Sequence, residues 1–170
     1  FLSVDKLLRK QFEIVTELSA YGNTVRKEIQ ELGPSCSIHV RRGDYLLKKN
    51  ANHVVLPIEY YKRSIDFYKR NFGNIKFFVF SDDIEWARKF FSSEEFVIVG
   101  NGTDRNPHED IELMKMCSHN IIANSTFSWW AAWLNPNKRK CVSVPSMWFV
   151  NVEHNKIISE DLIPERWHKI

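Results

Sequence analysis

Apolar residues recur along this chain with two spacings, one typical of amphipathic helices and one of buried strands. Repeats of three and four residues predict helices over residues 8–18, 25–32, 57–72 and 107–118, one that carries Trp86 and Phe90, and one that ends at Asn135. Uninterrupted apolar runs predict strands over residues 36–40, 76–80, 96–99, 119–123 and 140–144. Gly22 is expected to interrupt the helical pattern, and the segment after residue 144 is expected to be irregular.

These strands and helices alternate, and each connection between strands is long enough to cross over a sheet. Such crossovers make neighbouring strands parallel, and continuous apolar strands are typical of a sheet covered by helices on both faces. The sequence therefore predicts an α/β fold with an open, doubly wound, Rossmann-like parallel sheet. Folds of this class bind ligands at the carboxyl ends of their strands.

The composition is typical of a folded domain, and the net charge limits which classes of partner it can bind. Of the 170 residues, 44% are hydrophobic and 26% charged, which suits one ordinary domain or two very small ones. The net charge of +3 arises within residues 1–50, where nine Lys and Arg face six Asp and Glu. That surplus is too small to coat DNA, so we expect no nucleic-acid partner, but it suits one phosphorylated small molecule.

The cysteines and the absence of common motifs exclude several site classes. Cys36, Cys117 and Cys141 lie far apart in or beside apolar stretches without a CxxC pair, which favours neither a disulfide framework nor a zinc ribbon and indicates a reducing compartment. The sequence also lacks GxGxxG, P-loop, HExxH and GxSxG motifs and an acidic metal triad, so no metal site is predicted. No apolar run approaches the roughly 18 residues of a membrane span.

Three polar clusters follow predicted strands. They are His39-Val40-Arg41-Arg42-Gly43-Asp44, Ser81-Asp82-Asp83 and Asn124-Ser125-Thr126-Phe127-Ser128. Parallel strands bring their carboxyl ends to one edge of the sheet, so we expect the clusters to converge there. That convergence is a stronger indication of a site than any single cluster.

The first cluster is suited to a diphosphate. Strand alternation puts His39 and Arg41 on one face and Arg42 on the other. A guanidinium at a strand end can hold two phosphate oxygens. The alternative is a structural ion-pair network around Asp44 with His39 as a core histidine.

The other two clusters precede helices. Backbone N–H groups and the hydroxyls of Ser125 and Thr126 would form an anion site at a helix N-terminus, although an ordinary N-cap by either residue is the alternative. Ser81-Asp82-Asp83 is more typical of a capping sequence than of a site. The tryptophans that follow Ser128 are expected to pack in the core.

Asp110 is the remaining candidate. In the helix from Pro107, the inward stripe should contain Asp110, Leu113 or Met114, and Cys117. A carboxylate aligned with the core is costly unless it has donors, and guanine offers two adjacent N–H groups. The alternative is an interaction of Asp110 with its own helix N-terminus.

Four segments together resemble one known family. Residues 39–45 (HVRRGDY) resemble the first motif of the α-1,2-fucosyltransferases, glycosyltransferase family 11. Residues 110–135 (DIELMKMCSHNIIANSTFSWWAAWLN) resemble that family's most distinctive block, residues 77–91 (FFVFSDDIEWARKFF) its intermediate motif, and residues 161–170 (DLIPERWHKI) its C-terminus. The HxRR element alone is shared with other fucosyltransferases, whereas the long block is specific.

The resemblance implies inverting transfer of L-fucose from GDP-fucose to the 2-hydroxyl of a terminal galactose in a glycan acceptor, by a GT-B-like enzyme without metal or other cofactor. It implies that Arg41 holds the β-phosphate, His39 lines the GDP site and Asp110 reads guanine. Thr126, Phe127 and Ser128 would close on the diphosphate beside Ser125, Asp82 would contribute to the donor site, and Arg42 and Asp44 would support it. Asp44 is one candidate for the catalytic base; a residue outside this chain is the other.

The resemblance does not extend to the start of the chain, where the family's glycine-rich first motif has no counterpart. Residues 1–34 are therefore expected to be a helical lead-in or bridge from a missing N-terminal domain, and residues 35–170 the GDP-fucose-binding domain, one half of the enzyme. Phe12, Val15 and Val25 would leave an apolar face for self-association. Two other functions stay open: a transferase of another nucleotide sugar, and a non-catalytic nucleotide-binding module. The expected location is the cytoplasm, with membrane association in a bacterium, or the Golgi lumen in a eukaryote.

Overall fold

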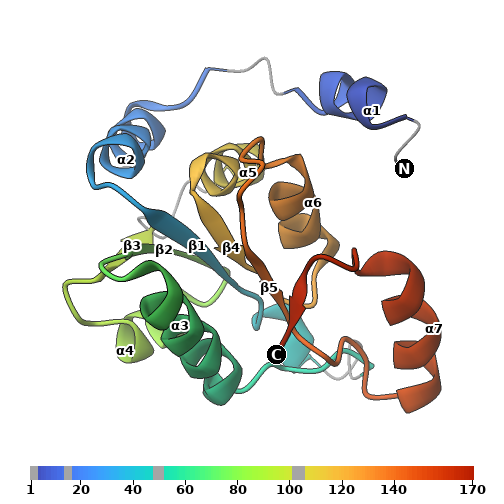
Figure 1. The fold of residues 1–170 in the computed structure, drawn as a ribbon. Coiled ribbons are helices and arrows are strands. Elements are labelled where there is room, and N and C mark those ends of the chain that lie inside the picture. Colours follow the sequence, from blue (N-terminus) through green and yellow to red (C-terminus); the bar gives the residue numbers. More distant parts are fainter. Residues whose placement is uncertain (1–3, 14–16, 48–51, 101–105) are drawn as a thin grey trace.

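A parallel sheet forms the centre of the protein. The computed structural model describes residues 4–13, 17–47, 52–100 and 106–170, and for residues 157–160 it describes the backbone alone. Within these ranges six strands pair in the order β3-β2-β1-β4-β5-β6, and all neighbours are parallel (Figure 1). The strands are β1 (Ser35–Val40), β2 (Lys76–Ser81), β3 (Phe96–Val99), β4 (His119–Ile121), β5 (Val142–Val144) and β6 (His168–Lys169).

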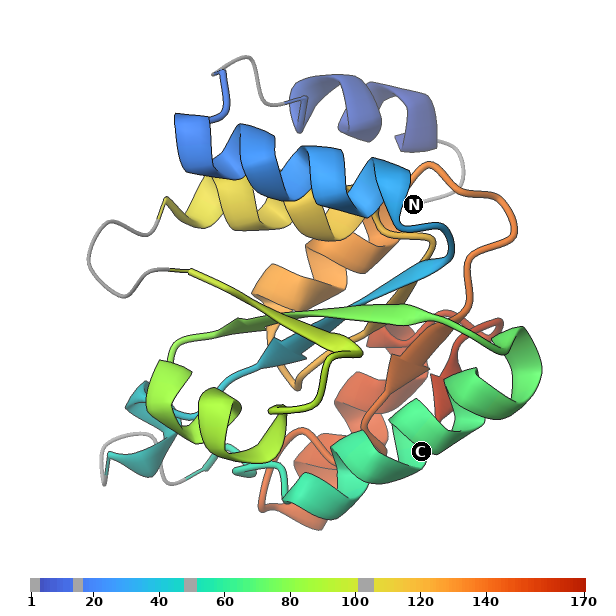
Figure 2. The same cartoon turned by 90° about the vertical axis from the view of Figure 1, so that its left-hand side faces the viewer.

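Helices cover both faces of this sheet, which confirms the predicted doubly wound α/β architecture. Figure 2 shows α2 (Ala20–Glu31), α5 (Pro107–Met116) and α6 (Thr126–Leu134) on one side. The other side carries α3 (Ile58–Phe72) and α4 (Ile84–Phe90).

Successive side chains of β2 point to opposite faces of the sheet and pack in two different hydrophobic cores. Phe77 and Val79 pack in the cluster of α3 and α4, whereas Phe78 and Phe80 pack with α2 and α5. All four are fully buried, as expected for a strand inside a two-faced parallel sheet. On β1 the same alternation turns His39 toward the α5 side, because Ile38 and Val40 belong to the α3 cluster.

The strand order fixes where a ligand can bind. β1 leads to β2 on one side of it, whereas β4 pairs on its other side, so the direction of winding reverses between β1 and β4. Chain segments diverge above such a reversal and leave a crevice outside the carboxyl ends of the strands.

The N-terminal helices differ from the prediction. The first, α1, covers Asp5–Gln11 rather than 8–18, of which residues 14–16 lie outside the described ranges. Gly22 lies inside α2 and does not interrupt it, because the hydroxyl of Ser19 caps the helix by accepting from the Gly22 N–H (3.0 Å). A Cβ at Gly22 would lie 3.1 Å from a carboxylate oxygen of Glu109, so glycine here permits the close approach of α5.

The expected free apolar face on these helices is also partly wrong. Val25 is buried against the sheet with α5, whereas Phe12 stacks on Trp130 with ring centroids 4.5 Å apart and stays 42% exposed. Val15 lies outside the described residues. The expectation is therefore wrong for Val25, and self-association stays a prediction.

The expectation of an irregular tail is wrong as well. Helix α7 (Val152–Leu162) begins where Asn151 accepts from the His154 N–H, and β6 then pairs with β5. Val152 is 74% exposed and β6 is two exposed residues long, so neither element produces a readable apolar period. No helix in the described residues is long and apolar enough to cross a membrane.

Candidate functional site

A cavity of about 690 Å³ opens at the carboxyl ends of β1, β2 and β4. It is lined by residues from all three predicted clusters and by Asp110, so the predicted convergence on one edge of the sheet is confirmed. The lining residues are His39, Arg41, Asp44, Tyr45, His53, Asp82, Pro107, Asp110, Asn124, Ser125, Thr126, Phe127, Trp148 and Phe149. What each of them does remains a prediction.

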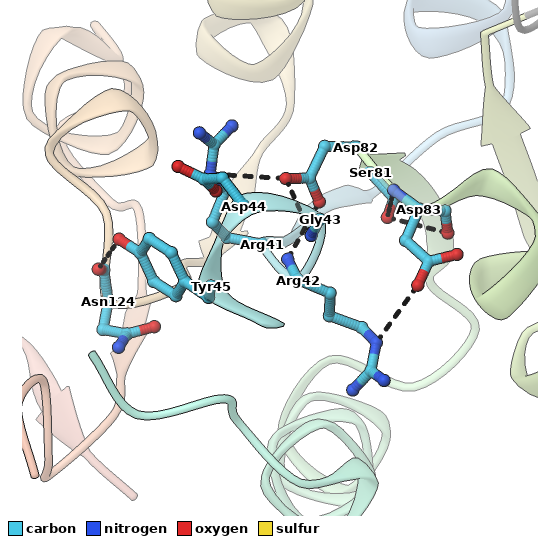
Figure 3. A network of polar contacts seen from close by, with 9 residues as sticks. All are labelled: Arg41, Arg42, Gly43, Asp44, Tyr45, Ser81, Asp82, Asp83 and Asn124. Carbon is cyan, nitrogen blue, oxygen red and sulfur yellow. Dashed lines mark hydrogen bonds and ion pairs between the residues drawn. The ribbon is translucent and has the colours of Figure 1, made fainter. Parts of the chain in front are cut away.

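Arg41 presents a cation to the cavity between two carboxylates. Its Nε lies 2.8 Å from Asp44 and 3.3 Å from Asp82, and Figure 3 shows its terminal nitrogens pointing away from both. The side chain is 34% exposed, so its charge is accessible to an anion. His39, one alternation earlier, is buried with its ring 5.3 Å from that of Phe127.

Arg42 points to the opposite side, as strand alternation predicts. Its Nε lies 3.4 Å from Asp83, and its guanidinium lies 4.5 Å from the centre of the Trp86 ring. Arg42, which was expected among the binding residues, does not line the cavity.

Asp82 holds the turn after β1. Its two oxygens accept the backbone N–H groups of Arg42 (2.9 Å) and Gly43 (3.1 Å). A Cβ at Gly43 would lie 3.1 Å from the Asp82 carboxylate, so the turn and the acid are closely packed. Asp83 instead caps α4 by accepting from the Trp86 N–H (3.0 Å). The capping prediction is therefore correct for Asp83, whereas Asp82 lines the cavity.

The N-terminus of α6 faces the cavity through Ser125 and Thr126. Ser125 occupies the N-cap position, but within the described residues its side chain accepts no capping hydrogen bond, so the alternative of a serine N-cap is not realised. The first N–H groups of a helix carry partial positive charge and suit an anion. Ser128 is buried and its hydroxyl donates to the carbonyl oxygens of Ala123 and Ser125, so it does not line the cavity.

Asp110 lies at the start of α5 and is 7% exposed. Leu113 and Met114 are buried on the same stripe, which confirms the predicted inward face. Glu109 beside it is used differently, because it accepts hydrogen bonds from the backbone N–H and hydroxyl of Ser19 and ties α5 to α2. Two adjacent carboxylates thus have separate tasks, and the inward one lines the cavity.

The sequence analysis did not predict that the rings of Tyr45, His53 and Phe149 line one side of the cavity, here called the aromatic wall. Tyr45 stacks on His53 with ring centroids 4.5 Å apart, and His53 lies 5.2 Å from Phe149. The Tyr45 hydroxyl donates to the Asn124 carbonyl oxygen (2.9 Å, Figure 3), and burial raises its pKa above the usual value. Tyr45 could have been found as the last residue of the HVRRGDY segment. His53 lies in a polar loop, and Trp148 and Phe149 lie in the segment after residue 144 that was expected to be irregular, so no local pattern singled them out.

The cavity thus offers a buried carboxylate, a partly exposed arginine and a helix N-terminus beside aromatic rings. In the described ranges no group of three or more His, Cys, Asp or Glu side chains gathers to hold a metal ion. Fold and site together define an α/β protein with a doubly wound parallel sheet and a ligand crevice at the carboxyl ends of its strands.

Comparison with known proteins identifies the family. The chain belongs to glycosyl transferase family 11, whose model matches residues 4–170. It is 38% identical over 141 residues to the O-antigen biosynthesis glycosyltransferase WbnK of Escherichia coli, covering 81% of this chain and 47% of the relative. An α-1,2-colitosyltransferase of Escherichia coli is 40% identical over 142 residues (80% and 47%). Galactoside α-(1,2)-fucosyltransferase 2 of Gorilla gorilla gorilla is 29% identical over 137 residues (72% and 40%). The chain spans about half the length of these relatives or less.

Proposed function

We propose that this chain binds GDP-fucose and forms the donor-binding half of an inverting, GT-B-type galactoside α-1,2-fucosyltransferase. One observation carries the proposal: a cavity at the sheet reversal that combines Asp110, Arg41 and the N-terminus of α6. The family match and the named fucosyltransferase relative support the reaction class.

Different residues would contact different parts of the nucleotide-sugar donor. Asp110 would accept the two adjacent N–H groups of guanine, a pairing that uracil and cytosine cannot offer. Arg41 and the first N–H groups of α6 would hold the diphosphate. His39 and Phe127 line the cavity beside these groups and would contact the nucleoside.

The mechanism follows from the leaving group. Breaking the sugar–phosphate bond moves an electron pair onto the β-phosphate, and the charge of Arg41 with the α6 dipole would stabilise it in a preorganised setting. The acceptor hydroxyl attacks the anomeric carbon from the opposite face, which inverts the configuration. Its proton goes to a base, for which Asp44 and a residue outside this chain are the candidates. Asp44 lies 2.8 Å from the Nε of Arg41, so it is close to the proposed phosphate contact.

A second donor sugar is favoured by one comparison. The α-1,2-colitosyltransferase is 40% identical to this chain, more than the named fucosyltransferase above. Colitose is fucose without its 3-hydroxyl, so the same nucleotide site would serve either sugar.

A nucleotide panel tests the proposal. Calorimetric titration with GDP, UDP and CMP should give the tightest binding for GDP, and Asp110→Asn should remove the preference, because a mispaired base leaves a buried group unsatisfied. Glu109→Gln is the matched control and should keep the preference, since Glu109 contacts Ser19. Tighter binding of UDP would favour a transferase of another nucleotide sugar. Equal affinities for GDP and UDP would contradict the guanine assignment.

A further inference from the structure

Three buried polar atoms of cavity-lining residues lack a partner. They are Nδ1 of His53, Oδ1 of Asn124 and the indole Nε1 of Trp148, each without a hydrogen bond among the described residues. Buried polar side-chain atoms are nearly always paired in native proteins, to protein, to water or to a ligand. His53, Asn124 and Trp148 are called the wall below. Three unpaired polar atoms on these neighbouring residues indicate a bound polar group that forms hydrogen bonds with them.

The ability of these atoms to donate or accept hydrogen bonds limits which chemical group can pair with all three. An indole N–H only donates, an amide oxygen only accepts, and a neutral imidazole nitrogen does either. Hydroxyl groups donate and accept, so a polyhydroxylated ring can satisfy all three. The neighbouring rings of Tyr45 and Phe149 offer apolar faces to the C–H side of such a ring.

The wall is fixed before any ligand binds. The amide nitrogen of Asn124 donates to the carbonyl oxygens of Val54 (2.9 Å) and Trp148 (2.8 Å), which sets the orientation of its Oδ1. An antiparallel bridge between His53 and Phe149 joins the two segments that carry the wall. Preorganisation of this kind favours one ligand orientation.

Contacts along the cavity place the wall next to the phosphate site. The Arg41 guanidinium lies 5.8 Å from the centre of the Tyr45 ring, and Tyr45 bonds to Asn124. Figure 3 shows Tyr45 between Arg41 and Asn124. A nucleotide sugar runs from base through diphosphate to sugar, so a donor with its base at Asp110 and its phosphates at Arg41 brings its sugar to this wall.

We infer that His53, Asn124 and Trp148 bind the transferred sugar of the donor through its hydroxyl groups. This inference rests on the proposed function, because it assumes that a nucleotide occupies the Asp110–Arg41 part of the cavity.

The test compares GDP with GDP-fucose in calorimetric titrations of the whole chain. Trp148→Phe keeps a buried ring and removes the indole N–H, so GDP-fucose should bind roughly five- to tenfold more weakly while GDP binding changes less than about twofold. His53→Phe keeps the stacked ring, removes Nδ1 and should act in the same way. The matched control is Trp167→Phe, because Trp167 is also buried with an unpartnered indole nitrogen but does not line the cavity. It should leave both affinities unchanged.

The possible results of these titrations distinguish a failure of the sugar-binding inference from a failure of the proposed function. A selective loss of GDP-fucose affinity in the two wall variants supports sugar binding. Equal losses for GDP and GDP-fucose, or no loss for either, overturn the inference and leave GDP binding intact as a function. A parent chain that binds neither ligand overturns the proposed function and the inference with it.

Discussion

The carboxylate of Asp82 lies 3.3 Å from the Nε of Arg41, although the two residues follow different strands. The same carboxylate accepts both N–H groups of the turn that follows Arg41. One acid at the end of β2 therefore fixes both the side chain and the backbone that present the cation of β1. This arrangement makes the arginine's position depend on the packing of two neighbouring strands.

Asp82→Ala should therefore weaken GDP binding by about tenfold, because Arg41 loses a charge partner and the turn loses two hydrogen bonds. Asp83→Ala is the matched control: it removes the α4 cap and the Arg42 contact and should lower the melting temperature with little change in affinity. Calorimetry and thermal unfolding of both variants check this. An Asp83 variant that loses as much affinity as the Asp82 variant would contradict it.

Arg41→Ala should weaken GDP binding far more than Arg42→Ala. A charge-assisted phosphate contact is worth about 1.5–3 kcal/mol, or roughly ten- to 150-fold in affinity. Arg42 packs on Trp86 outside the cavity, so its loss should appear in stability rather than in binding. The measurement is the GDP dissociation constant of each folded variant, and a larger loss for the Arg42 variant would show that the two roles are reversed.

Lys140 gives the fold a pH dependence. Burial, with Arg9 and Arg166 nearby, lowers the pKa of its ammonium group from 10.5 to about 8. Between these values the unfolded chain holds a proton on Lys140 that the folded chain has released, so Lys140 contributes a rise with pH to the free energy of unfolding. The thiols of Cys36, Cys117 and Cys141, whose pKa values burial raises, contribute a fall, so the contribution of Lys140 is read from the difference between two variants. Lys140→Gln should remove that rise, and the exposed Lys138→Gln should keep it. Urea unfolding from pH 7 to 10 checks the prediction, and identical slopes for the two variants would contradict it.

Most of the fold was predictable because buried strands and amphipathic helices leave strong periods in the sequence. All five predicted strands exist, as does the inward stripe of Asp110, Leu113 and Met114. The tail was not predictable, because α7 exposes Val152 and β6 is stabilised by pairing with β5 rather than by burial of its own side chains.

The site was predictable only where it follows a strand. His39, Arg41, Asp82 and Ser125 stand directly at strand ends or helix starts, so topology alone brings them together. The aromatic wall comes from two irregular segments that meet through an isolated bridge between His53 and Phe149. No local period encodes such a meeting.

Removal of divalent cations should leave GDP affinity unchanged. Arg41 and the α6 N-terminus supply the positive charge that Mg²⁺ or Mn²⁺ would otherwise bring to a diphosphate. Titrations with GDP in EDTA and in added Mg²⁺ compare the two conditions. A large loss in EDTA that Mg²⁺ restores would mean that the metal contributes to binding.

This chain by itself should bind nucleotide without transferring sugar. It spans 47% of the named bacterial relatives, and a transferase of the proposed GT-B type works in a cleft between two domains. Holding donor and acceptor together supplies much of the rate of a bimolecular transfer, so loss of the acceptor-binding part should cost several orders of magnitude. The assay uses radiolabelled GDP-fucose and a galactose-terminated acceptor, with a longer protein that contains this chain as the reference. Calorimetry with GDP on the same preparation shows that the chain is folded and competent to bind. Equal turnover by the two proteins would mean that the acceptor site lies within these 170 residues.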